Sequence, residues 1–149
     1  NHPALQHAGG KGKPVILGTG MSTLREAREA VEAVWSTGNR DVILMHCTSK
    51  YPCLPGEANL AAMKSLEKLG CLTGYSDHTL GSLAAVSAVA LGAAVLEKHL
   101  TLDKKMSGPD HEASMTPPQF KRMVGDVRQV EAMLGGGEKK PAVGEKKAA

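Results

Sequence analysis

Two histidines stand out because each follows an apolar run and has a carboxylate next to it. His78 lies in the segment Ser76-Asp77-His78-Thr79, and His99 ends the segment Glu97-Lys98-His99. An apolar run followed by a turn is typical of a buried strand, so we expect each imidazole at the carboxyl end of a strand. Imidazole nitrogens bind divalent cations. The pattern therefore predicts a metal site shared by His78 and His99. The alternative is two unrelated rings bonded to backbone carbonyls.

The sequence allows more than one role for several residues around the two histidines. Asp77 and Glu97 are expected either to orient the imidazoles from behind or to bond to nearby backbone. Lys98 alternates with its neighbours and is predicted to point away from them, into the wall of the fold. His46 follows another apolar run, and a packed, hydrogen-bonded histidine is favoured there over a third metal ligand.

Four apolar runs alternate with four helical patterns along the chain. The expected strands are 14–17, 41–46, 71–75 and 93–97, and the expected helices are 24–35, 60–69, 80–91 and 117–134. Capping boxes at Thr23 and Thr116 predict two of the helix starts. Such alternation predicts an α/β fold with a parallel sheet and right-handed crossovers. Two architectures fit, a doubly wound open sheet and half of a (β/α)8 barrel, which needs about 250 residues when whole. The dinucleotide fingerprint G-x-G-x-x-G is absent.

Further polar side chains are expected at the same rim, because active sites in both architectures lie at the carboxyl ends of the strands. Ser49 and Tyr51 alternate along an extended segment after the second strand, so they are predicted to face the same side. Their hydroxyls suit a sugar or polyol, and a plain surface loop is the alternative. Asp110 lies in the long loop 100–114, where it either reaches a substrate or caps a turn.

Composition excludes several classes of protein. The 149 residues are 42% hydrophobic but only 3% aromatic, with a net charge of +3. Nucleic-acid binding requires a basic face with stacking aromatics, and no membrane-spanning apolar run occurs. The three cysteines lack a metal or redox spacing, which favours reduced thiols in the cytoplasm.

Five segments of the chain resemble the N-acetylneuraminate (sialic acid) synthase family, in family order and with family spacing. They are Gly18-Thr19-Gly20-Met21, His46-Cys47-Thr48-Ser49-Lys50-Tyr51-Pro52, Gly74-Tyr75-Ser76-Asp77-His78-Thr79, Glu97-Lys98-His99-Leu100-Thr101-Leu102-Asp103 and Gly108-Pro109-Asp110-His111. The resemblance covers residues 1–137 and implies the C-terminal half of a TIM (β/α)8 barrel. Residues 138–149 would then be a basic linker toward an antifreeze-like (SAF) domain.

The resemblance also implies an activity. Members of the family condense phosphoenolpyruvate with N-acetylmannosamine and water, giving N-acetylneuraminate and phosphate with C–O cleavage. By motif, His78 and His99 are the ligands of Mn²⁺, or of Mg²⁺ or Co²⁺, which polarises the sugar aldehyde. Ser76 corresponds to a phosphoenolpyruvate contact, and Ser49, Tyr51 and Asp110 correspond to sugar-binding positions. The parent enzyme would be a cytoplasmic homodimer.

Other functions remain open. One is a synthase of a related nonulosonic acid, legionaminic or pseudaminic acid, since Gly18 and Ser49 replace residues found in some relatives. Another is a non-catalytic module of a polysaccharide pathway. The family's general base and phosphate-holding lysines belong to earlier barrel units. We therefore expect the isolated chain to show no measurable turnover and to associate through its open sheet edges.

Overall fold

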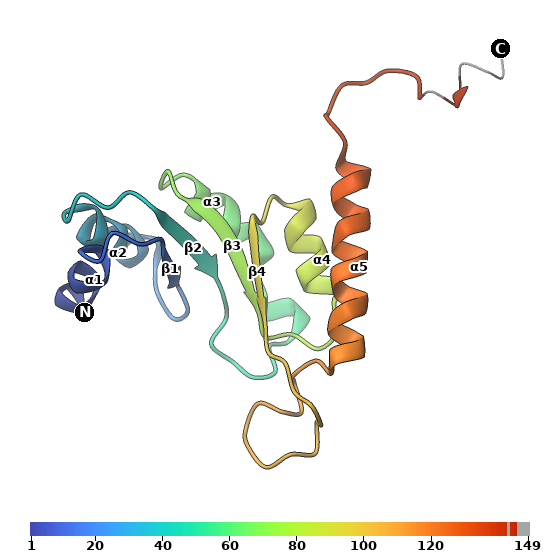
Figure 1. Ribbon diagram of the computed structural model, residues 1–149, viewed down its shortest axis with the longest axis horizontal. Helices are drawn as coiled ribbons and strands as arrows, with labels where there is room; N and C mark the ends of the chain where they lie inside the picture. The colour runs from blue at the N-terminus through green and yellow to red at the C-terminus, as the bar shows by residue number, and fades with distance from the viewer. Residues whose placement is uncertain (143, 146–149) are drawn as a thin grey trace.

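The computed structural model describes residues 1–142 and 144–145. Its strands are β1 (Val15–Gly18), β2 (Val42–His46), β3 (Leu72–Asp77) and β4 (Val95–Lys98). Its helices are α1 (His2–Gly9), α2 (Leu24–Trp35), α3 (Met63–Glu67), α4 (Leu83–Ala90) and α5 (Pro117–Leu134), with short 3₁₀ turns at Pro55–Glu57 and Leu60–Ala62. All four predicted βα units are therefore present (Figure 1).

Several element boundaries differ from the sequence expectation, and three of these differences affect how the elements meet. The helix expected from residue 80 begins at Leu83, because Gly81 has a φ of +76° that a right-handed helix cannot include. The helix expected over 60–69 is a 3₁₀ turn followed by the short α3. The third strand continues to Asp77, two residues beyond its expected end, because its last residues still pair with β4.

The strand order decides between the two predicted architectures. The strands are parallel and adjacent in chain order, β1-β2-β3-β4, without the reversal that defines a doubly wound sheet. The paired residues Leu17, Leu44 and Thr73 share one sheet face, and the apolar residues of that face are the ones that contact helices. Sequential parallel strands with helices on one face form a half-barrel, as predicted.

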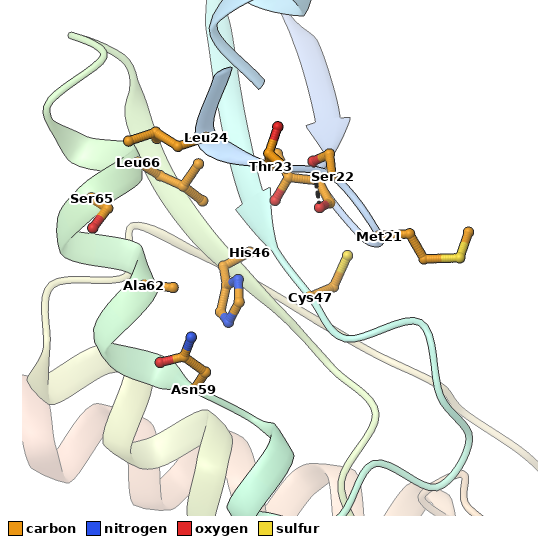
Figure 2. A pocket seen from close by; sticks show the side chains of 11 residues that line it. Met21, Ser22, Thr23, Leu24, His46, Cys47, Asn59, Ala62, Ser65 and Leu66 are labelled. Carbon is orange, nitrogen blue, oxygen red and sulfur yellow. Dashed lines mark hydrogen bonds between the residues drawn. The ribbon is translucent and has the colours of Figure 1, made fainter. Parts of the chain in front are cut away.

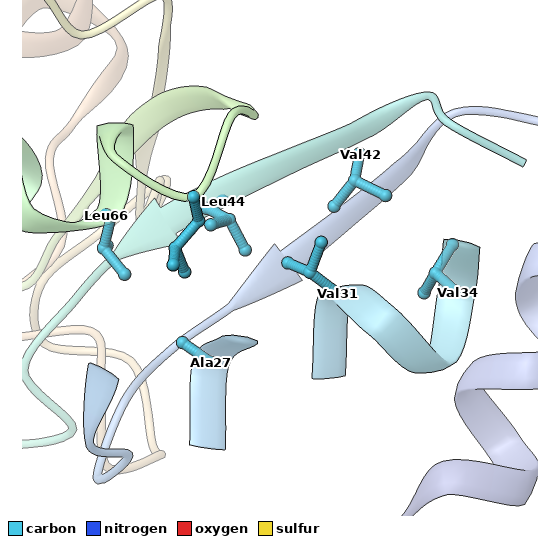
Figure 3. Packing of buried hydrophobic residues seen from close by; sticks show 7 residues of the cluster. Ala27, Val31, Val34, Val42, Leu44 and Leu66 are labelled. Atoms are coloured by element: carbon cyan, nitrogen blue, oxygen red, sulfur yellow. The ribbon is translucent and has the colours of Figure 1, made fainter. Parts of the chain in front are cut away.

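The hydrophobic core lies between this sheet face and the helices. Its largest cluster joins α2 and α3 to β2 and is shown in Figure 3: Ala27, Val31, Val34, Val42, Leu44, Leu66 and Leu69. The opposite, concave face carries exposed apolar side chains, since Ile16 is 58% and Leu72 is 62% exposed. Gly74 also lies on this face, where a Cβ atom would come within 2.6 Å of the Val95 carbonyl.

The last helix closes the unit. A capping box between Thr116 and Gln119 starts α5, which packs on α4 through Met123 and Ala85. Residues 138–142 form no helix or strand, and residues 143 and 146–149 of the predicted linker lie outside the described residues. Assignment of 138–149 as a linker stays a prediction. Among the described residues, no helix combines the length and apolarity needed to cross a membrane.

The two sheet faces predict different costs for the same kind of truncation. Leu44→Ala should lower the free energy of unfolding by about 2–5 kcal/mol, because Leu44 is fully buried beneath α2 and α3. Ile16→Ala, on the concave face, should change it by less than about 0.5 kcal/mol. Urea unfolding followed by circular dichroism measures both. Equal losses for the two variants would contradict this division of the faces.

Candidate active site

Three aromatic rings meet at the carboxyl ends of β3 and β4. The His78 and His99 rings are edge-to-face, with centroids 5.4 Å apart and an interplanar angle of 88°. The Tyr51 ring, from the loop after β2, lies 4.1 Å from the His78 centroid and 5.2 Å from the His99 centroid. The structure thus brings the two predicted metal ligands and one predicted sugar-binding residue together at one rim.

A backbone carbonyl fixes the tautomer of His78. Its Nδ1 lies 2.7 Å from the Thr48 carbonyl oxygen, which only accepts, so Nδ1 carries the proton. The remaining nitrogen, Nε2, then presents a lone pair, 3.3 Å from the Ser76 hydroxyl oxygen. Ser76 Oγ lies closer to Glu97, donating to Oε1 at 2.6 Å. The Ser76 proton is therefore engaged elsewhere, and Nε2 is left able to bind a cation.

The long loop 100–114 brings Asp110 beside the second histidine. Asp110 Oδ2 is 3.8 Å from His99 Nδ1, and the His99 side chain is one-third exposed. The base of the loop is closed by Met115 N, which donates to the His99 carbonyl, and within the loop Ser114 Oγ donates to the Asp110 carbonyl. A carboxylate and an imidazole nitrogen thus lie near each other, and both side chains are partly exposed.

The two carboxylates beside the histidines have different partners. Asp77 forms an ion pair with Lys98 on the helix-facing side, with Nζ–Oδ2 at 2.9 Å, and accepts bonds from Thr79. It therefore bonds to Lys98 and the local backbone rather than directly to an imidazole. Glu97 reaches the site through Ser76 instead. Lys98 points away from Glu97 and His99, as the alternation predicted.

Ser49, the other predicted sugar-binding residue of the loop after β2, has a different neighbour from Tyr51. Ser49 packs against Gly20, where a Cβ atom would come within 2.1 Å of the serine hydroxyl. Burial raises the pKa of the Tyr51 phenol above its ordinary value, and the negative charge of Asp110 adds to the effect. Tyr51 therefore presents a neutral hydroxyl group beside the histidines. A role for Ser49 stays a prediction.

His46 belongs to a separate pocket on the helix side of the sheet. Its Nε2 lies 2.9 Å from the Ala58 carbonyl, which confirms the prediction of a packed, hydrogen-bonded histidine. Figure 2 shows it lining a cavity of about 190 Å³ with Cys47, Asn59 and Ser22. His46 pairs with Tyr75 of β3, whose side chain is buried on the helix side of the sheet. The His46 ring therefore lies on that side too, away from His78 and His99.

The donor set limits how a metal could be held. Among residues 1–142 and 144–145, no three side chains of His, Cys, Asp or Glu lie close enough together to form a protein-only metal site. His78 and His99 would supply two ligands, and water or substrate oxygens the others. Mg²⁺ commonly keeps several waters, and Mn²⁺ accepts water and carbonyl oxygens. The residues present fit such an open site, because the Thr48 carbonyl engages Nδ1 of His78 and leaves Nε2 as the ligand atom.

Comparisons with known proteins assign the chain to a family. Residues 1–139 match the NeuB family. The chain belongs to the NeuB family. It is 53% identical over 146 residues to an uncharacterised protein of Methanocaldococcus jannaschii, covering 97% of this chain and 43% of that protein. It is 46% identical over 147 residues to the N,N'-diacetyllegionaminic acid synthase of Legionella pneumophila, covering 95% of this chain and 41% of that enzyme.

A solved structure of a sialic acid synthetase superimposes on nearly the whole chain. The N-acetylneuraminic acid (sialic acid) synthetase of Leptospira borgpetersenii, determined with citrate, superimposes with a TM-score of 0.89 and 34% identity. The match covers 98% of this chain and 51% of that one. The chain spans less than half the length of the curated relatives it matches. The family resemblance seen in the motifs is thus confirmed, and the Legionella and Leptospira relatives are named as synthases of legionaminic and sialic acid.

Several features of the rim had little or no signal in the sequence. The Thr48 carbonyl that fixes the His78 tautomer is a backbone atom, so no residue type marks it. Thr79, which bonds Asp77, appeared only as the end of a motif. The link from Glu97 to Ser76 follows from their pairing across β3 and β4, which a strand alignment at the two motifs would have revealed.

The environment of the two tyrosines predicts an alkaline titration. Burial raises the pKa of both Tyr51 and Tyr75, most strongly for Tyr75, where the charge of Asp77 adds to it. Both phenols of the folded chain should therefore remain mostly protonated at pH about 10, where free tyrosine is half-ionised. Because the unfolded phenols ionise first, the free energy of unfolding should fall as the pH rises above about 10. Phenolate absorbance measures this. Half-ionisation of both phenols near pH 10 before unfolding would contradict it.

Proposed function

We propose that this chain forms part of an enzyme that condenses phosphoenolpyruvate with an N-acylated amino-sugar aldehyde and water, giving a nonulosonic acid and phosphate. The observation that carries the proposal is the convergence of His78, His99 and Tyr51 at one rim of a NeuB half-barrel. The parent activity requires an aldehyde to be held and polarised beside the second substrate. This rim offers two cation ligands and a neutral hydroxyl within one small area.

The proposed roles follow from the contacts. A bound divalent ion, Mn²⁺ in our assignment, would supply Lewis acidity toward the aldehyde oxygen. His78 would bind it through Nε2, because Thr48 holds the proton on Nδ1. His99 would be the second ligand. Tyr51 and Asp110 flank these rings and would orient the sugar.

Phosphoenolpyruvate is assigned to the concave face next to the histidines. Ser76 and Glu97 lie side by side there, and the Ser76 hydroxyl donates to Glu97. Because the oxygens of phosphoenolpyruvate only accept, the Ser76 hydroxyl would turn from Glu97 to donate to the bound substrate. Ser49 completes the proposed sugar side from the second loop. A phosphate contact from a side chain is absent at Gly18, so the phosphate must be bound by other groups.

The primary candidate substrate is N-acetylmannosamine, giving N-acetylneuraminate. The second candidate is the diacetylated sugar precursor of legionaminic acid, which the name of the 46% identical Legionella enzyme favours. We further propose that the chain is the C-terminal half of the barrel, that residues 138–149 lead toward an antifreeze-like domain, and that the whole enzyme is a cytoplasmic homodimer.

A chimera tests this proposal. The matching 147 residues of the Legionella synthase are replaced by this chain, and phosphate release from phosphoenolpyruvate is followed with each candidate sugar and added Mn²⁺. We expect turnover, and its loss by at least about a hundredfold in His78→Ala and in His99→Ala. His7→Ala, an exposed histidine of α1, is the matched control and should leave the rate unchanged.

Two results would overturn the assignment. One is a folded chimera that releases no phosphate with any N-acylated amino sugar. The other is full activity after both histidine substitutions, which would remove the metal site from the mechanism while leaving the family membership intact.

A further inference from the structure

A single buried ammonium group holds both residues that flank His78. Lys98 Nζ donates to Asp77 Oδ2 at 2.9 Å and also to the Thr79 carbonyl oxygen. The other oxygen of Asp77 accepts from the backbone N–H and the hydroxyl of Thr79, each at 2.8 Å. Lys98 is itself joined by a peptide bond to His99. The Lys98 ammonium thus links the residues on both sides of His78 to the backbone next to His99.

The burial of this pair makes its role specific. The Lys98 and Asp77 side chains are 1% and 0% exposed. Taking two charges out of water is costly, and a buried pair is often replaceable by apolar residues without loss of stability. Stability alone is therefore a weak reason for this pair. Its position at the last rung of the β3–β4 ladder points to a geometric reason.

We propose that Asp77 and Lys98 are a positioning pair that fixes the spacing and direction of the His78 and His99 imidazoles. The inference rests on the proposed function, since it concerns the same two histidines. Because side chains alternate along a strand, fixing residues 77 and 98 on the helix side directs residues 78 and 99 to the opposite side. The two hydrogen bonds from Thr79 to Asp77 then define the turn that contains His78.

A second anchor explains why small shifts would matter. The His78 carbonyl accepts from Cys53 N at 2.8 Å, and His78 Nδ1 must reach the Thr48 carbonyl at 2.7 Å. Both partners belong to the loop after β2. If the 77–79 turn relaxes away from Lys98, the His78 ring leaves the Thr48 carbonyl and its tautomer is no longer fixed.

The test compares Lys98→Met with the unaltered chain in two measurements. The first is Mn²⁺ affinity, from the loss of the free-ion electron paramagnetic resonance signal. Removing a positive charge near the site would by itself tighten cation binding. The positioning role predicts the opposite sign, a weakening of at least about tenfold, as is typical when a supporting group behind a metal ligand is removed. Lys64→Met, which breaks the exposed pair with Glu67, is the control for charge and should show no change.

The second measurement needs no metal. A long-range ¹H–¹⁵N spectrum at a pH of about 8 reports which imidazole nitrogen carries the proton. The unaltered chain should show His78 protonated at Nδ1, and Lys98→Met should show a mixture of tautomers. Circular dichroism verifies that the variant is folded. Should Lys98→Met fail to fold, Lys98→Arg replaces it in both measurements, because the larger planar guanidinium keeps the charge but must displace the groups that enclose the compact, buried ammonium.

The outcomes separate this inference from the proposed function. Unchanged or tighter Mn²⁺ binding together with an unchanged His78 tautomer, in a folded Lys98 variant, would overturn the positioning role. Absence of Mn²⁺ binding in the unaltered chain would instead overturn the metal assignment. In that case the tautomer measurement alone decides whether Asp77 and Lys98 position the histidines.

Discussion

The hydrogen-bond register between β3 and β4 is the constraint on which the rim of this half-barrel depends. Ser76 lies opposite Glu97, and Asp77 lies opposite Lys98, so two adjacent rungs place one polar pair on each sheet face. The concave pair faces the open side, and the other pair is sealed beneath the helices. A slip of one residue would exchange the two faces and bury the wrong groups. The strand pairing therefore determines the chemistry of the rim as well as the fold.

Much of this arrangement was predictable because the sequence repeats one simple rule. Apolar runs followed by polar motifs indicated four strands with their functional ends at one rim, and the alternation of Glu97, Lys98 and His99 indicated which side chains diverge. The choice between barrel and doubly wound sheet was not predictable from these patterns. Both architectures use the same βα unit, and they differ only in strand order, which depends on contacts between units.

The features that the sequence concealed share a physical origin. The Thr48 carbonyl belongs to the backbone, and its position depends on the path of a loop whose Cys53 pairs with the distant Thr79. The start of α4 shifted because Gly81 adopts a positive φ, a property of the turn rather than of helical periodicity. Ser49 and Tyr51 share a predicted strand-like alternation, yet Ser49 packs on Gly20 while Tyr51 packs on histidine. Local patterns predict elements well, and they predict loop contacts poorly.

The placement of the core on only one sheet face has a thermodynamic consequence. The apolar clusters of this chain lie between the sheet and its helices, whereas Ile16 and Leu72 leave the concave face uncovered. In the closed barrel of the proposed enzyme, the remaining strands and the substrates would contact this same face. A ligand that touches both halves favours their association, and association in turn favours the ligand by the same free energy. Barrel closure and substrate binding would then be two linked equilibria that share one surface.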